Sequence, residues 1–311
     1  MSQASQPNVP VVGFFSPRSG VGATSLVYHV GHMLADLGVR TVMVDLDPQA
    51  DLSIACVAAS VLVDLWEEPA GETTILALVE ALSSGQRPAP APAFPLTDRL
   101  GVIVGDPRLV LLEGLLAPGH SADPEDTPFR AMLHADAEAF AAAMVILDLG
   151  PSLGALNRVA LQACDSIVVP ITNDIFAVHV FRAVAAALGR WRMVPRRMTP
   201  VGYVVQEHAP RLAETSGASP VTRLSAEYGR SVLREIETLG HSLASEPSCI
   251  GAIKPFHSLQ RMAAEARRPM FSLRPADGAV GSHALAVQEA YRDYRALTLE
   301  ILRRVGVAAA T

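Results

Sequence analysis

Apolar and polar residues alternate in blocks along most of the chain. Six blocks are short, apolar and rich in β-branched residues, which is typical of strands buried on both faces of a sheet. They cover Val9–Phe15, Arg40–Asp47, Leu100–Asp106, Ala143–Gly150, Cys164–Thr172 and Pro200–His208. Between them, apolar residues recur at helical spacing. This order predicts a doubly wound α/β fold, in which a mostly parallel twisted sheet is covered by helices on both faces.

Two stretches interrupt the pattern. Residues 83–99 are rich in Ala and Pro, and residues 118–128 are polar with several prolines, so both are predicted to be exposed loops. Residues 1–8 are predicted to be a flexible N-terminus. No repeat divides the chain, and we therefore expect residues 1–311 to form a single domain.

The composition sets limits on partners and compartment. Half of the 311 residues are hydrophobic and the net charge is −6, so a nucleic-acid contact would need a local basic patch. Three cysteines lie far apart without CxxC spacing, which argues for a reduced, cytoplasmic setting and against a zinc site. No apolar run reaches ~18 residues, so a membrane span is not expected.

Glycines and aspartates follow three of the predicted strands. Gly20 and Gly22 come after the first, Asp45 and Asp47 end the second, and Asp148 ends the fourth. In parallel sheets, ligands bind at the carboxyl ends of the strands. The turn "GVGATS" can point backbone N–H groups at an anion, and the helix that follows adds its positive N-terminal dipole. A tight strand–helix connection is the alternative interpretation, but three such features in one sheet favour a phosphate site.

Oxygen ligands for a metal ion lie in the same segments. The Thr24 hydroxyl stands where it can bind Mg²⁺, and Asp45 and Asp148 can hold the water shell of the ion or polarise an attacking water.

Four segments resemble a known family. "RSGVGATS", "VMVDLDPQADLS", "VILDLGPSLG" and "DSIVVPITNDIFAVHVF" resemble, in order and spacing, the deviant Walker A, A′ and B segments of the ParA/MinD family of P-loop ATPases. The resemblance extends through Ile253–Val287 and therefore covers nearly the whole chain. The "DLDPQA" element points to the ParA branch, which partitions chromosomes and plasmids.

The resemblance implies a nucleotide-dependent switch. In such proteins, two subunits form a homodimer that encloses two ATP molecules, with ATP, ADP and Mg²⁺ as cofactors. The ATP-bound dimer binds DNA nonspecifically and is nucleoid-associated in the cytoplasm. A ParB-like or cargo-adaptor partner stimulates hydrolysis, and DNA or protein cargo is thereby positioned.

Position by position, the resemblance also implies roles. Arg18 stands in the place of the signature lysine that reaches across the dimer, and Asp47 in the place of the residue that orients the attacking water. Thr24, Asp45 and Asp148 match the magnesium site. The residues matched to nucleotide binding are Ser19, Gly20, Val21, Gly22, Ala23, Thr24 and Ser25 at the phosphates, and Gln206 and Pro255 at the adenine.

One departure from the family pattern affects catalysis. Ala23 stands where the family has the P-loop lysine, which lies against the β- and γ-phosphates. Arg18 keeps the positive charge of the signature lysine that it replaces, and its planar guanidinium suits phosphate oxygens. The missing lysine charge at Ala23, in contrast, predicts poor hydrolysis or none. Ala23 fits a natural loss of activity or a deliberate Lys→Ala replacement, and the three intact aspartates favour the second.

Basic residues gather in two segments of the second half of the chain. Such clusters can contact phosphate backbones without reading bases, whereas the alternative is a solvated helix end and loop. The candidate DNA-binding residues are Arg192, Arg196, Arg197, Lys254, Arg261, Arg267 and Arg268.

The last predicted helix, within residues 291–307, has apolar residues at helical spacing beside arginines. MinD-like proteins use a basic amphipathic C-terminal helix at membranes, but Asp293 and Glu300 dilute the basic face here, so we expect a helix packed on the sheet. The leading function is thus a ParA-type switch. The alternatives are a non-catalytic interaction protein of the same fold and, less favoured, a membrane-associated positioning factor of MinD type.

Overall fold

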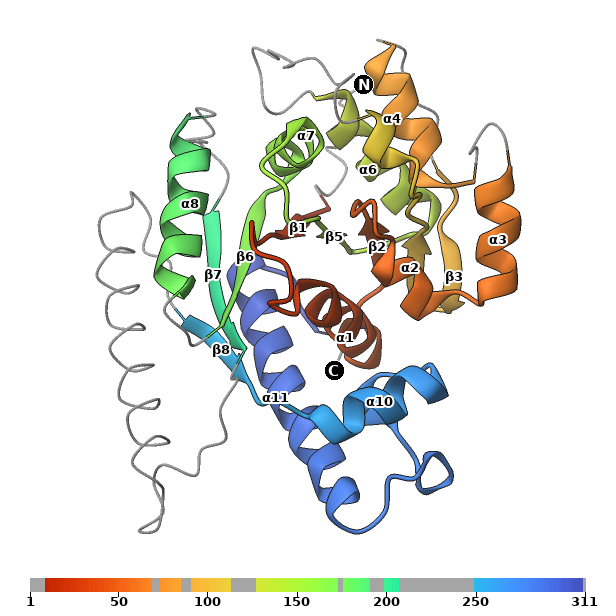
Figure 1. Ribbon diagram of the computed structural model, residues 1–311, viewed down its shortest axis with the longest axis vertical. Coiled ribbons are helices and arrows are strands. Elements are labelled where there is room, and N and C mark those ends of the chain that lie inside the picture. Colours follow the sequence, from red (N-terminus) through yellow and green to blue (C-terminus); the bar gives the residue numbers. More distant parts are fainter. Residues whose placement is uncertain are drawn as a thin grey trace, which may run out of the picture.

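Eight strands form one sheet in the computed structural model, which describes residues 9–68, 73–84, 91–112, 127–172, 176–190, 199–206 and 249–309. The strand order is β3-β4-β2-β5-β1-β6-β7-β8 (Figure 1). The strands are β1 (Val11–Phe14), β2 (Thr41–Asp45), β3 (Phe94–Thr97), β4 (Leu100–Ile103), β5 (Met144–Asp148), β6 (Ser166–Thr172), β7 (Thr199–Gln206) and β8 (Cys249–Ile253). Every neighbouring pair is parallel except β3–β4. The predicted fold class is confirmed.

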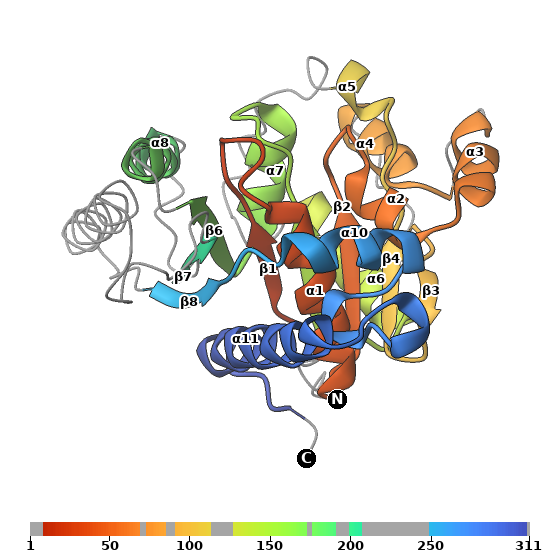
Figure 2. The ribbon, with the colours of Figure 1, turned by 60° about the horizontal axis from the view of Figure 1, so that its bottom comes forward.

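Helices cover both faces of the sheet, because successive residues of each buried strand point to opposite sides. Val12 and Phe14 belong to the hydrophobic cluster that contains residues of α1, α10 and α11, whereas Val11 belongs with Phe15 to the cluster that contains residues of α4, α6, α7 and α8. The two sets of helices lie on opposite faces of the sheet (Figures 1 and 2). The helices are α1 (Ala23–Asp36), α2 (Asp51–Cys56), α3 (Ala59–Glu67), α4 (Ile75–Ser83), α5 (Leu109–Leu112), α6 (Pro128–Ala139), α7 (Ala155–Ala163), α8 (Phe176–Arg190), α10 (His257–Ala266) and α11 (Ser282–Val305), with short 3₁₀ turns η3 (Met270–Ser272) and η4 (Pro275–Asp277).

The C-terminal helix α11 lies against β8 and α1 and buries its apolar side. Leu297, Ile301 and Leu302 are almost completely buried, so the prediction of a helix packed on the sheet is confirmed. Among the helices that the structure describes, none is long and apolar enough to cross a membrane.

Helix α1 is tied to the C-terminal segments through His29. The His29 ring stacks on Tyr294 of α11 at 4.7 Å, its Nε2 accepts the Met270 N–H at 3.1 Å, and its Nδ1 donates to the Ser25 carbonyl at 2.7 Å. Burial lowers the pKa of His29 to about 4, which keeps the ring neutral and able to accept from Met270. The helix that begins at the glycine turn is therefore fixed against the end of the chain.

Both loop predictions were partly wrong. Phe94–Thr97 is strand β3, antiparallel to β4 at the sheet edge, and an edge strand tolerates Pro95 because its N–H side need not be paired. Thr127 is buried and caps α6, accepting the Arg130 N–H at 3.2 Å, with Pro128 as the first helical residue. Residues 1–8, 85–90 and 118–126 lie outside the described residues.

Candidate nucleotide-binding site

The glycine turn connects β1 to α1 and leaves the start of that helix open to an anion. Gly20 and Gly22 have φ angles of 75° and 78°, a left-handed conformation that favours glycine. Gly22 precedes α1, and no side chain caps the helix among the described residues. The first N–H groups of α1 are thus available to phosphate oxygens, and the dipole of a 14-residue helix supports them.

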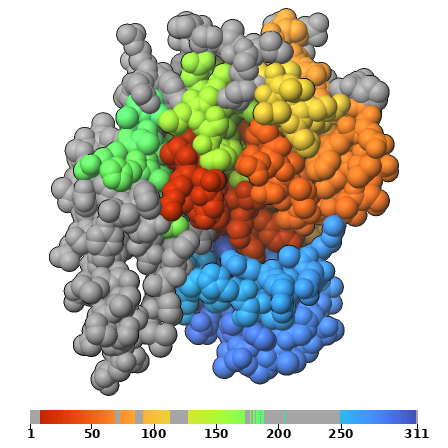
Figure 3. All heavy atoms as spheres, in the orientation of Figure 1, coloured from red at the N-terminus to blue at the C-terminus, as the bar shows by residue number. Residues whose placement is uncertain are grey.

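The turn reaches the surface of the molecule. Ser19 and Gly20 are exposed, whereas Val21 is only 2% exposed and anchors the turn in the core. Figure 3 shows the N-terminal segments, coloured red, emerging between the green, orange and blue parts of the chain. A ligand can therefore approach the turn from solvent.

The positive side chain that the turn can contribute to a phosphate site depends on two positions, Ala23 and Arg18. Ala23 is the first residue of α1 and brings no charge. Arg18 is half-buried, and its Nη1 donates to the Thr172 hydroxyl at 3.1 Å, at the end of the neighbouring strand β6. In this single chain Arg18 lies against its own sheet, and the contact across a dimer remains a prediction.

Asp45 and Asp148 lie side by side at the carboxyl ends of β2 and β5. The two residues are direct partners in the register of these strands, and they are 0% and 1% exposed. Burial raises the pKa of Asp45 above its ordinary value. Burial also raises the pKa of Asp148 well above its ordinary value, and the neighbouring Asp45 carboxylate raises it further. Two adjacent buried carboxylates of this kind are stabilised by taking up a proton or by binding a cation.

The surroundings of the two carboxylates differ. Asp45 accepts hydrogen bonds from the Ser53 N–H at 2.9 Å and the Ser53 hydroxyl at 2.7 Å. Neither oxygen of Asp148 accepts a hydrogen bond of ordinary geometry from the described residues, although the nearby Thr24 hydroxyl lowers its pKa. Asp148 is the orphaned partner.

These residues fit a magnesium ion. Two buried carboxylates and a hydroxyl are hard oxygen donors, and one carboxylate lacks a partner among the described residues. The described residues contain no cluster of three or more His, Cys, Asp or Glu side chains that would form a complete protein cage. That suits Mg²⁺, which usually keeps water molecules and binds through one or two carboxylates plus the phosphates of a substrate.

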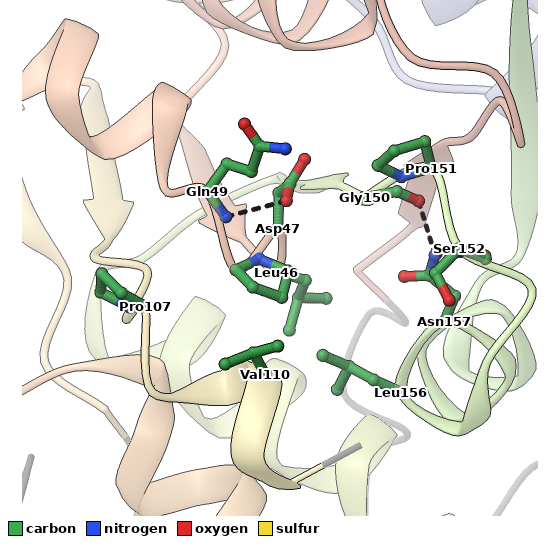
Figure 4. A pocket seen from close by; sticks show the side chains of 11 residues that line it. Leu46, Asp47, Gln49, Pro107, Val110, Gly150, Pro151, Ser152, Leu156 and Asn157 are labelled. Carbon is green, nitrogen blue, oxygen red and sulfur yellow. Dashed lines mark hydrogen bonds between the residues drawn. The ribbon is translucent and has the colours of Figure 1, made fainter. Parts of the chain in front are cut away.

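Asp47 lies beside an open pocket of about 450 Å³ (Figure 4). Its Oδ1 accepts the Gln49 N–H at 2.9 Å, and burial raises its pKa. The opposite wall is held by Asn157, whose amide donates to the carbonyls of Gly150 and Ser152 at 2.6 and 2.7 Å. A Cβ on Gly150 would lie 3.2 Å from the Asp47 carboxyl carbon, so glycine permits this close approach. The lining residues are Leu46, Asp47, Pro48, Gln49, Pro107, Val110, Gly150, Pro151, Ser152, Leu156 and Asn157.

The two predicted adenine contacts come from the same edge of the sheet. Gln206 is the last residue of β7 and pairs in register with Thr172 on one side and Ile253 on the other. Pro255 follows β8 and is half-buried. The Gln206 side chain lies outside what the structure describes, so its role remains a prediction.

The candidate DNA-binding residues divide into three groups. Arg192, Arg196 and Arg197 lie outside the described residues. Lys254 forms an ion pair with Glu289 at 2.9 Å, and Arg267 donates to the Val57 carbonyl at 2.9 Å, so both have structural contacts. Arg261 is exposed near Glu265, and Arg268 is half-buried.

Sequence reasoning missed three residues that shape the site. Ser53 and Gly105 surround Asp45, and Thr172 holds Arg18. Ser53 ends the family-like segment Val42–Ser53, but no feature of the sequence around it indicates a contact with Asp45. The contacts of Gly105 and Thr172 join residues far apart in the chain, which no local pattern shows.

A family model described as an AAA domain, AAA_31, matches residues 10–192, which is more than half of the chain. The chain belongs to this family. It is therefore a ParA-like P-loop protein, as the four segments predicted.

Sequence relatives agree with this assignment. The chain is 25% identical to the sporulation initiation inhibitor protein Soj of Bacillus subtilis, over 54% of this chain and 60% of that protein. It is 29% identical to a probable plasmid-partitioning protein ParA of Thermus thermophilus, over 61% of this chain and 53% of that protein. The matched region thus spans between half and two thirds of these curated relatives.

Solved structures share the fold. A pNOB8 ParA bound to nonspecific DNA has a TM-score of 0.61 at 14% identity, over 96% of this ParA-like chain and 99% of the other. An ATP complex of a Cyanothece McdA variant has a TM-score of 0.66 at 12% identity, over 98% of this chain and 100% of the other.

Proposed function

We propose that the protein is a ParA-type switch that binds ATP with Mg²⁺ at the β1–α1 turn, forms a homodimer across that site and positions a cargo. The observation that carries this proposal is the uncapped start of α1, lying beside the orphaned Asp148 and its partner Asp45. The turn suits a triphosphate, and the carboxylates suit its metal ion. The relatives named Soj and ParA, and the ATP complex of McdA, support the same assignment.

Each group at the site then has a defined role. The α1 N–H groups bind phosphate oxygens, and Thr24 with Asp45 and Asp148 would hold Mg²⁺, which supplies positive charge to the phosphates when bound. Asp47 orients a water for in-line attack on the γ-phosphate, and Arg18 contacts phosphate. Ala23 adds no charge, and we propose that hydrolysis is slow for this reason.

The surface around Asp47 suits a protein partner. Val110 lines the pocket and is 61% exposed, and the chain neighbours of two lining residues, Leu111 and Leu153, are 72% and 40% exposed. Exposed apolar groups near a pocket commonly mark protein contacts. We propose that a second subunit and a ParB-like or cargo-adaptor protein bind on this side of the sheet.

Nucleotide binding and dimerisation can be measured together. We expect ATP with Mg²⁺ to bind in calorimetry and to shift the protein from monomer to dimer in light scattering, whereas ADP binds without a stable dimer. A dimer of the same size with and without nucleotide would instead favour the second candidate, a non-catalytic interaction protein. The missing charge at Ala23 is the observation that keeps this candidate open.

We also propose that the ATP-bound protein binds duplex DNA nonspecifically, and the pNOB8 ParA bound to nonspecific DNA supports this proposal. The double variant Arg196→Ala/Arg197→Ala should weaken binding equally for different sequences, and the slope of log K against log salt should fall by roughly 0.9 for each phosphate that is no longer neutralised. Arg303→Ala is the matched control, because Arg303 is exposed but paired with Glu300 on α11. Affinity that does not change with salt would rule out this role.

A further inference from the structure

A buried serine fixes the carboxylate of Asp45. Ser53 is the third residue of α2 and is 0% exposed. Its N–H and its hydroxyl both donate to Asp45 Oδ2, at 2.9 and 2.7 Å. Because Ser53 follows the connection that carries Asp47, these bonds tie that connection back to the end of β2.

The direction of the serine proton follows from its second contact. Ser53 Oγ accepts the Gly105 N–H at 2.8 Å. A hydroxyl has a single proton, and the Gly105 N–H already donates to this oxygen, so the proton of Ser53 points to Asp45. The Asp47 N–H donates to the other carboxylate oxygen of Asp45 at 3.2 Å. Asp45 thus receives three hydrogen bonds from its own chain.

Gly105 closes the other side of the carboxylate. A Cβ at this position would lie 2.7 Å from Asp45 Cγ, a distance that Cβ atoms essentially never show. The Gly105 carbonyl accepts the Trp66 indole N–H at 2.9 Å, which holds the β4–α5 connection in place. A side chain at position 105 must therefore displace the Asp45 carboxylate.

We infer that Ser53 is a positioning residue, which together with Gly105 holds Asp45 in the orientation that the magnesium–nucleotide complex requires. This inference rests on the proposed function. Asp45 is the fixed carboxylate of the pair, and Asp148 is the one that responds to the ion. Groups that orient metal-site carboxylates in this way commonly change metal affinity by about 10–100-fold when they are removed.

The variant Ser53→Ala tests the inference through binding rather than turnover. Calorimetry measures the affinity for ATP and ADP over a series of Mg²⁺ concentrations and again in EDTA. We expect the Mg²⁺ concentration at half-maximal effect to rise about 10–100-fold, while the affinity in EDTA stays at the level of the parent protein. Ser53→Thr keeps the hydroxyl and should restore the Mg²⁺ dependence.

Thr74→Val is the matched control. The Thr74 hydroxyl also donates to a buried carboxylate, Asp106 Oδ2, at 3.0 Å, and both residues are 0% exposed. Its removal deletes the same kind of bond at the start of α4, on the residue that follows Gly105 but on a carboxylate other than Asp45 and Asp148. We expect this variant to lose stability but to keep the Mg²⁺ dependence of the parent.

The variant Gly105→Ala displaces the Asp45 carboxylate sterically. It serves as the test if Ser53→Ala does not fold. A folded Ser53→Ala protein with the parent's Mg²⁺ dependence would overturn the inference, as would an equal loss of affinity in EDTA and in Mg²⁺. A parent protein that binds no nucleotide would overturn the proposed function itself.

Discussion

Replacing Ala23 with lysine is expected to raise ATP hydrolysis by about 10²–10³-fold, the usual effect of one group that stabilises charge in the transition state. Position 23 is the first residue of α1 and is half-buried, so a long side chain can extend toward the phosphates bound at the turn. ATP affinity should increase as well, because the positive lysine would attract the phosphates of bound ATP before the reaction begins. Phosphate release and calorimetry measure the two effects separately.

Ala23→Gln is the control for this prediction. Glutamine has nearly the length of lysine but no charge, so it should reproduce any effect of side-chain packing and none of the electrostatic gain. If Ala23→Lys gains neither turnover nor affinity, the interpretation of a functional ATPase with one lysine replaced is wrong. The protein would then be a naturally inactive member of the family that acts through binding alone.

The strands that place the site were predictable because they are buried on both faces. β1, β2 and β5 read as unbroken apolar runs, and the aspartates that end β2 and β5 lie directly opposite each other in the sheet. β3 and β8 were missed for a physical reason. The residues of β3 alternate between half-buried and exposed at one edge of the sheet. β8 forms the other edge, and only two of its five residues are buried, so neither strand forms an unbroken apolar run.

The residues of the site also fall into two groups, those that the sequence predicts and those that it does not. The glycine turn, Thr24 and the aspartates are local signals, since each sits at a fixed offset from a strand or a helix. The hydrogen bonds of Ser53 with Gly105 and of Arg18 with Thr172 depend on how distant segments pack. Sequence reasoning therefore found which residues carry charge, but not which neighbours hold them in place.

The variant Asp148→Asn is expected to stabilise the nucleotide-free protein while it removes the effect of Mg²⁺ on nucleotide binding. The folded state raises the pKa of Asp148 well above its ordinary value of 3.8, chiefly through burial. Ionising this carboxyl therefore costs stability, which is lost progressively as the pH rises from about 4 toward the pKa of the folded state. Asparagine does not titrate, so the variant should be more stable near neutral pH, by about 1–3 kcal/mol, with the difference shrinking on acidification.

Asp136→Asn provides the comparison that separates stability from function. Asp136 lies on α6 and is 2% exposed, and neither of its carboxylate oxygens accepts a hydrogen bond of ordinary geometry from the described residues, although the nearby Ala91 N–H lowers its pKa. Burial raises its pKa to about 7, so the same stabilisation with pH is expected. Since it is not one of the paired carboxylates at the ends of β2 and β5, Mg²⁺-dependent binding should not change.

Thermal unfolding at several pH values, with and without Mg²⁺ and ATP, distinguishes the outcomes. Both variants should unfold at a higher temperature than the parent protein without ligand, and only Asp148→Asn should lose the further gain from Mg²⁺ and ATP. An Asp148→Asn protein that keeps this gain would show that Asp148 does not serve the metal. If the prediction holds, the chain keeps a buried carboxyl whose ionisation costs stability, and that cost is offset only when a cation binds beside it.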